Sequence, residues 1–140
     1  MDKEILSIIL LLVFLLLVGL LIFLSNSKKI DSTIRKRIYS DLLQIKVLIK
    51  NGNSLLNRDA IIRLDSLLAK SLQLYYKNSE SCGTNLKNAK TLFNKKEYNQ
   101  IWEIHKLRNK VVHENQEVST SQLTNGYNII AKAIQKLLYG

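Results

Sequence analysis

Hydrophobic residues at the start of the chain form one uninterrupted run. From Ile5 to Leu24, twenty consecutive residues carry no charge, and most of them are Leu, Ile or Val. A helix of that length measures about 30 Å, which matches the hydrocarbon thickness of a bilayer. The run therefore predicts a single transmembrane helix.

A secretory signal is the alternative for this run, because Ser25-Asn26-Ser27 offers small residues of the kind found at a cleavage site. The apolar run exceeds the about 7 to 15 residues of a signal peptide, which favours an uncleaved anchor. Only Lys3 precedes the run, whereas basic residues follow it closely: Lys28, Lys29, Arg35, Lys36 and Arg37. Because such residues stay in the cytoplasm, we expect a single-pass protein of the cell membrane with a cytoplasmic C-terminal domain.

Beyond the run, apolar residues recur at intervals of three and four, the spacing of amphipathic helices. This spacing predicts three helices over about 34–49, 54–76 and 98–112. It also predicts a short helix capped by Thr84, between the second and third of these, and a last helix that begins at Ser119. There, Ser-x-x-Gln resembles a capping box. No segment has the alternating pattern of a β-strand. The predicted fold is all-α, with one transmembrane helix followed by a small up-and-down bundle of four or five helices.

These elements divide the chain into a membrane anchor with a polar joint (1–27), an amphipathic helix with a turn (28–53) and a helical bundle (54–140). The polar joint itself runs from Ser25 to Lys29. The amphipathic helix fits a place in the bundle. Its alternative is a position on the lipid headgroups, because its polar side carries four cations: Arg35, Lys36, Lys46 and Lys50.

The net charge of +10 favours a partner rich in phosphate, either nucleic acid or the anionic headgroups of the lipid bilayer. The composition also permits a neutral explanation, since Lys outnumbers Arg by sixteen to five, as AT-rich coding would produce. Cys82 is the only cysteine, which excludes an internal disulfide and a thiolate metal cage. The two histidines have no carboxylate pair or cysteine near them in the sequence, and the chain has no Gly-rich phosphate loop. From the spacing of these residues we expect no metal and no cofactor.

Two charged residues occupy apolar positions of predicted helices. Arg108 falls on the apolar side of the helix over 98–112, and Asp65 falls within the apolar arc of the helix over 54–76. Burying an unpaired guanidinium costs several kcal/mol. The sequence therefore predicts an ion pair between Asp65 and Arg108. His105 shares this apolar side and is interpreted as a core or interface histidine.

The segment Leu107-Arg108-Asn109-Lys110-Val111-Val112-His113-Glu114 resembles the Arg-x4-His signature of the HEPN superfamily. The chain from Ala60 to Tyr139 also resembles compact HEPN-like proteins, with a Leu-Asp-x-Leu-Leu helix and a Trp-Glu-x-His-Lys-Leu-Arg-Asn helix. The resemblance implies a helical bundle that pairs into a homodimer and acts on RNA or on a nucleotide-bearing partner.

In catalytic HEPN proteins the RNA 2′-hydroxyl attacks its own phosphate without a metal. The resemblance implies that His113 transfers the proton, that Arg108 stabilises the charge on the phosphorus oxygens and that Asn109 assists them. The toxin subgroup often continues His-x-Tyr, but this chain has Asn115 in place of that Tyr. Three functions stay open: a metal-independent RNase, a domain that binds RNA without cleaving it, and a structural adaptor at the cytoplasmic membrane face. A helix-terminal role is the alternative for His113.

Overall fold

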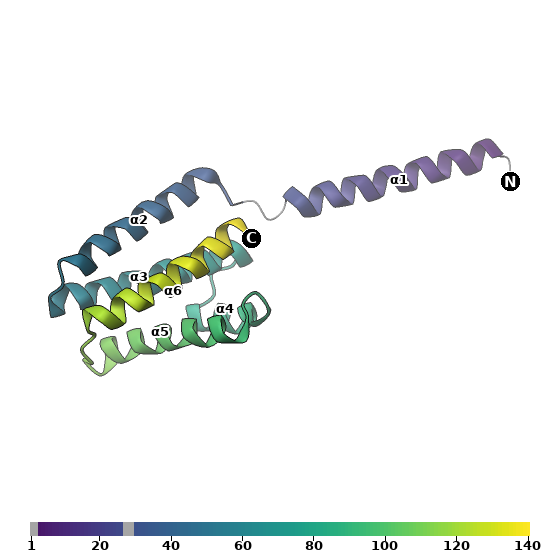
Figure 1. The fold of residues 1–140 in the computed structure, drawn as a ribbon. Coiled ribbons are helices and arrows are strands. Elements are labelled where there is room, and N and C mark those ends of the chain that lie inside the picture. The colour runs from purple at the N-terminus through teal and green to yellow at the C-terminus, as the bar shows by residue number, and fades with distance from the viewer. Residues whose placement is uncertain (1–2, 27–29) are drawn as a thin grey trace.

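The structure is a computed structural model that describes residues 3–26 and 30–140, with the backbone alone for residues 24–26. Its helices are α1 (Lys3–Asn26), α2 (Ser32–Lys50), α3 (Ser54–Tyr76), α4 (Cys82–Asn88), the short 3-10 helix η1 (Ala89–Thr91), α5 (Lys95–His113) and α6 (Thr120–Tyr139). α1 extends away from a bundle formed by the other helices (Figure 1). The predicted all-α arrangement of one apolar helix ahead of a bundle is confirmed.

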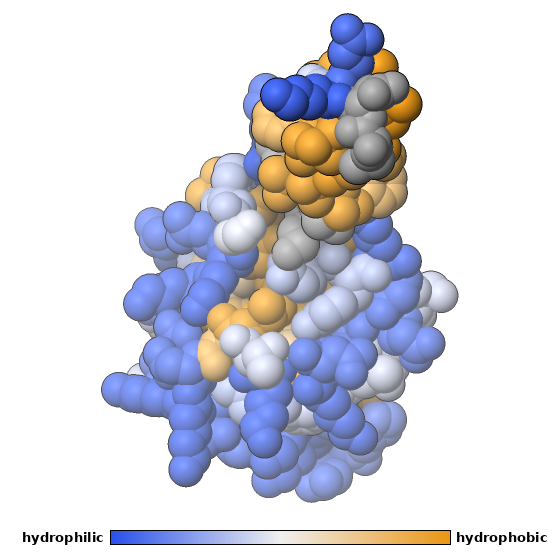
Figure 2. All heavy atoms as spheres, turned by 90° about the vertical axis from the view of Figure 1, so that its right-hand side faces the viewer, coloured by the Kyte–Doolittle hydropathy of each residue, from blue (hydrophilic) through white to orange (hydrophobic). Residues whose placement is uncertain are grey.

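α1 is long and apolar enough to cross a membrane. The 21-residue stretch Lys3–Phe23 has this property, and its side chains are not buried against the bundle. Figure 2 shows the contrast between the hydrophobic surface of α1 and the largely hydrophilic surface of the bundle. The helix continues through Ser25 and Asn26, where the sequence predicts the start of the polar joint. The rest of that joint, 27–29, including Ser27 of the possible cleavage site, lies outside the described residues.

α3 lies at the centre of the bundle and packs against α2, α4, α5 and α6. Its apolar residues repeat at three and four positions, so one wide face of the helix is buried. The largest fully buried apolar side chains come from all five of these helices: Ile38, Ile61, Leu64, Leu68, Leu72, Leu86, Ile101, Val111, Leu123, Ile130 and Ile134. α2 contributes a buried face to this core, which supports its place in the bundle.

The segment between α3 and α5 differs from the expected helix. Ser81, and not Thr84, caps α4, because the Ser81 hydroxyl accepts a hydrogen bond from the backbone N–H of Thr84. The helix then tightens into η1 and stops. α5 begins at Lys95, three residues earlier than predicted, because Asn94 and Glu97 form a capping box. The predicted capping box at Ser119, with Gln122, is present at the start of α6.

Polar side chains of α3 fix the turn that joins α5 to α6. The Nη1 of Arg58 donates to the backbone carbonyl of Val111 at 2.7 Å, and so satisfies one of the free carbonyls at the end of α5. The buried Nδ2 of Asn57 donates to the carbonyl of Val118 at 3.1 Å. Between these contacts, Asn115 has a φ of 52°, a left-handed conformation that Asn tolerates better than most residues. These bonds hold both ends of the turn against α3.

Candidate functional site

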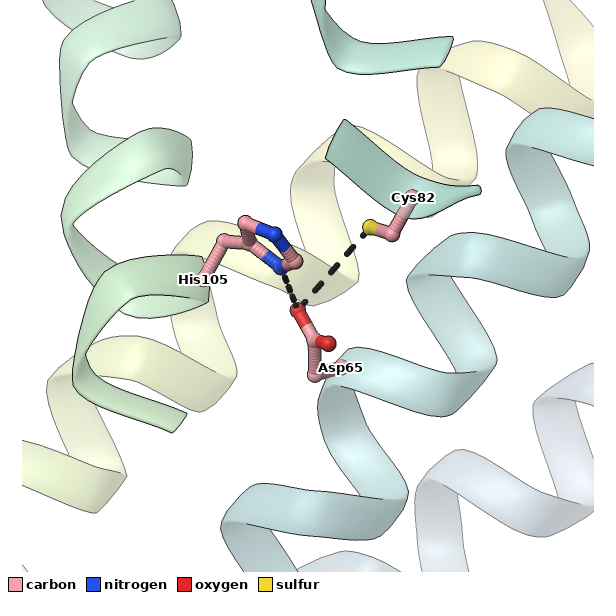
Figure 3. A group of neighbouring side chains, drawn as sticks. All are labelled: Asp65, Cys82 and His105. Atoms are coloured by element: carbon pink, nitrogen blue, oxygen red, sulfur yellow. Dashed lines mark hydrogen bonds and ion pairs between the residues drawn. The ribbon is translucent and has the colours of Figure 1, made fainter. Parts of the chain in front are cut away.

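A buried carboxylate lies at the centre of a polar cluster between α3, α4 and α5. Asp65 is only 3% exposed. Its Oδ1 lies 2.8 Å from Nδ1 of His105 and 3.9 Å from Sγ of Cys82 (Figure 3). Its Oδ2 lies 3.6 Å from Nε of Arg108. We call these four residues, Asp65, Cys82, His105 and Arg108, the Asp65 cluster.

Helical spacing explains how three separate segments meet in this cluster. His105 and Arg108 are three residues apart on α5, so their side chains leave the same face of that helix. Asp65 faces them from the buried arc of α3, and Cys82 reaches the same carboxylate from the first residue of α4. The ion pair between Asp65 and Arg108 that the sequence predicts is present at 3.6 Å. His105 lies closer to Asp65 than Arg108 does, and the sequence does not predict that contact.

The guanidinium of Arg108 contacts other side chains on one side and is exposed to solvent on the other. Besides the ion pair with Asp65, its Nη1 donates to Oδ1 of the neighbouring Asn109 at 2.9 Å. The buried Nε has no hydrogen-bond partner among the residues that the structure describes, since 3.6 Å from Asp65 is too long for a hydrogen bond. The side chain remains 29% exposed. Arg108 can therefore still donate hydrogen bonds to a ligand at the surface.

His113 does not join this cluster. It is the last residue of α5, at the helix end as predicted, but it still follows the helical rotation. Residues five positions apart in a helix point about 140° apart and are separated by about 7.5 Å along the axis. The two residues of the Arg-x4-His motif therefore point away from each other within one chain, and His113 is exposed to solvent.

Cys82 is poorly suited to act as a nucleophile. Burial raises the pKa of its thiol to about 12, the negative charge of Asp65 adds to this increase, and the positive charge of Arg108 partly opposes it. At neutral pH the sulfur therefore keeps its proton and is weakly reactive. The thiol also contacts the carboxylate and not a histidine base, so the arrangement differs from that of a Cys-His-Asp triad.

Three side chains of the cluster have the chemistry of metal ligands. A ring nitrogen of His105, a carboxylate oxygen of Asp65 and the sulfur of Cys82 all lie within 4.8 Å of one another. The sequence does not predict this group, because its members are 17 or more positions apart and belong to three different helices. The Asp65 cluster could therefore hold a metal ion, contrary to what the spacing of His and Cys along the chain indicates.

The Arg-x4-His motif lies at the end of α5, the penultimate long helix of the bundle. The chain matches no protein-family model, no curated protein and no solved structure.

Proposed function

We propose that the chain is a membrane-tethered, HEPN-like helical domain that binds RNA or a nucleotide-bearing partner on the cytoplasmic side. The observation that carries this proposal is a groove of about 290 Å³ between the C-terminal half of α5 and the first turns of α6. Its lining residues are mostly lysines and side-chain amides: Glu103, Ile104, Lys106, Leu107, Lys110, Gln116, Gln122 and Asn125. Ammonium groups neutralise phosphates, and amides donate to and accept from base edges.

The two lysines of this groove lie on one exposed face of α5, and His113 lies on the same face. Lys106, Lys110 and His113 follow one another at intervals of four and three residues, so they share one exposed face of the helix. Glu103 is the only acidic lining residue, and it forms an ion pair with Lys106 at 3.0 Å. A second ammonium, that of Lys110, remains for an RNA phosphate, and His113 extends this face to the end of the helix.

Cleavage of RNA would require a second copy of the chain. Arg108 and His113 diverge by about 140° on the same helix, so one copy does not offer both groups to one phosphate. In a homodimer, His113 of one protomer could approach Arg108 of the other. Cleavage of RNA by the wild type in the presence of EDTA, together with loss of cleavage in both Arg108→Ala and His113→Ala, would establish a metal-independent RNase. RNA that is bound and left intact would establish the non-cleaving function.

The binding proposal is tested with the full chain in nanodiscs of zwitterionic lipid and a fluorescent single-stranded RNA. Binding should weaken steeply as salt is added, because counterions are released from the RNA. Substituting Lys106→Gln together with Lys110→Gln should lower the affinity about tenfold and reduce the salt dependence. The matched control is Lys46→Gln with Lys50→Gln, two exposed lysines of α2 at the same spacing. Equal losses in both variants, or no binding by the wild type, would contradict the proposal.

A second candidate function, an adaptor at the membrane face, is favoured by the distribution of charge. Chain connectivity limits the distance from Asn26 to Ile30 to about 14 Å, so the start of α2 lies near the end of the anchor. The helix ends on that side of the bundle are rich in cations, which include Arg35, Lys36, Arg37, Lys77, Lys87, Lys90, Lys95, Lys96, Lys132 and Lys136. Acids are fewer there and include Asp31, Glu80 and Glu97. Figure 2 looks onto this side and shows hydrophilic residues around the bundle.

Anionic headgroups attract such a surface by about 1 kcal/mol for each cation close to the membrane. Hydrogen exchange distinguishes the two functions. The adaptor function predicts that anionic lipid in the nanodisc slows amide exchange at the end of the bundle near α1. If this is observed, and RNA neither binds nor protects the groove between α5 and α6, the adaptor function replaces RNA binding. Protection of that groove by RNA in zwitterionic nanodiscs would instead favour the RNA-binding domain.

A further inference from the structure

Three different donor atoms converge in the Asp65 cluster from three helices. α3 supplies the carboxylate of Asp65, α4 the sulfur of Cys82 and α5 the imidazole of His105 (Figure 3). The shortest separation in this group is 2.8 Å, between Nδ1 of His105 and Oδ1 of Asp65, and every separation is within 4.8 Å. The three side chains point toward one another across the space between the helices.

These separations are close to those around a tetrahedral zinc ion. Zinc binds oxygen and nitrogen at about 2.0 to 2.2 Å and sulfur at about 2.3 Å, so its ligand atoms lie about 3.3 to 3.7 Å apart. The oxygen and nitrogen must therefore separate by about 0.5 Å, and the other pairs must approach by no more than about 1 Å. Side-chain rotations of this size leave the three helices in place. Calcium and magnesium prefer oxygen ligands alone, so a nitrogen-sulfur-oxygen set selects against them.

Neighbouring side chains orient two of the three ligands. Arg108 lies next to Oδ2 of Asp65, so Oδ1 remains directed at His105 and Cys82. The ion pair at 3.6 Å thus holds the second oxygen of the carboxylate and orients the first. Trp102 packs edge-to-face against the ring of His105, with centroids 5.7 Å apart, and restricts its rotation. His105 and Cys82 are both partly exposed, which provides an entry path.

We propose that Asp65, Cys82 and His105 bind one zinc ion, with water as the fourth ligand. The thiol of Cys82 releases its proton to solvent as the sulfur binds the metal, and a ring nitrogen of His105 binds in its unprotonated form. The bound ion joins α3, α4 and α5. This inference goes beyond RNA binding and does not depend on it, because none of the three ligands lines the groove between α5 and α6.

Cobalt is the probe for this site, because Co²⁺ can replace zinc and, unlike zinc, absorbs visible light. A cobalt-thiolate bond adds a charge-transfer band in the near ultraviolet. The full chain in zwitterionic nanodiscs is freed of metal with a chelator and titrated with Co²⁺. We expect one Co²⁺ per chain, a charge-transfer band and its loss when Zn²⁺ is added. A wild type without this band, or a band that survives Cys82→Ser, would overturn the proposal.

The two histidines of the chain provide a matched pair of variants. His105→Gln should weaken Co²⁺ binding at least tenfold, whereas His113→Gln should bind as the wild type does. Circular dichroism checks that each variant is folded, and Zn²⁺ should raise the Tm of the wild type and of His113→Gln only. Equal losses in the two histidine variants, or an equal rise in Tm in Cys82→Ser, would show that the metal binds elsewhere and would refute the site.

Discussion

Replacing Asp65 with alanine is expected to lower the free energy of unfolding of the bundle by about 3 kcal/mol, a change of more than a hundredfold in the folding equilibrium. The carboxylate is buried and contacts both His105 and Arg108. Its removal leaves a partly buried guanidinium without its counter-charge. Removing one partner of a buried ion pair costs about 3 to 5 kcal/mol, and the partial exposure of Arg108 favours the lower end of that range.

Denaturant titration of the full chain in nanodiscs, in the presence of a chelator, measures this loss. Trp102 is the only tryptophan and contacts His105, so its fluorescence reports on the unfolding of this region. The matched control is Asp59→Ala, which removes another carboxylate of α3. Asp59 forms an exposed ion pair with Arg63 at 2.8 Å, worth no more than about 0.5 kcal/mol. Similar losses in the two variants would show that the Asp65 cluster does not stabilise the fold.

Two arginines in the middle of α1 are expected to abolish membrane integration. Val13→Arg and Leu17→Arg lie near the centre of the apolar run, and each arginine costs about 2.5 to 3.5 kcal/mol on insertion into a bilayer. The wild-type chain should remain with the membranes after extraction at alkaline pH. The double variant should appear in the soluble fraction.

The control for this variant places the same two arginines on the bundle. Leu43 and Val47 lie four residues apart on α2 and are 62% and 57% exposed, so Leu43→Arg with Val47→Arg should leave the chain in the membrane fraction. Intact mass provides a second test. A membrane-bound chain keeps the full 16.1 kDa, whereas a smaller product that lacks α1 would show that the run is a cleaved signal.

The long helices could be predicted from the sequence because their signals are local. The apolar spacing of α3 and the turn residues at either side place its ends at Ser54 and Tyr76, as observed. The capping box at Ser119 likewise gives the start of α6. The change from α4 to η1 at Ala89 could not be predicted in this way, because apolar spacing continues across it. The capping box of Asn94 and Glu97 then starts α5, which only three residues separate from the end of η1.

The candidate site could be predicted only in part, because its contacts are between helices. Their apolar positions in the predicted helices indicate that Asp65 and Arg108 need partners. In the structure Oδ2 of Asp65 and Nε of Arg108 lie 3.6 Å apart. The contacts of Asp65 with His105 and Cys82 depend on how α3, α4 and α5 are packed, which helical periodicity does not determine. His105 lies on the apolar side of the predicted helix, three residues before Arg108, and this position is the signal that could have indicated its contact with Asp65.

Photo-cross-linking of RNA to the full chain in zwitterionic nanodiscs tests most directly whether the bundle binds RNA between α5 and α6. Mass spectrometry then identifies the cross-linked peptides. We expect them to contain residues that line the groove, on α5 around Lys106 and Lys110 and from Gln116 to Asn125. We also expect excess unlabelled RNA to remove these cross-links. Cross-links confined to α2, or no cross-linked peptide from the chain, would contradict the proposed RNA-binding function.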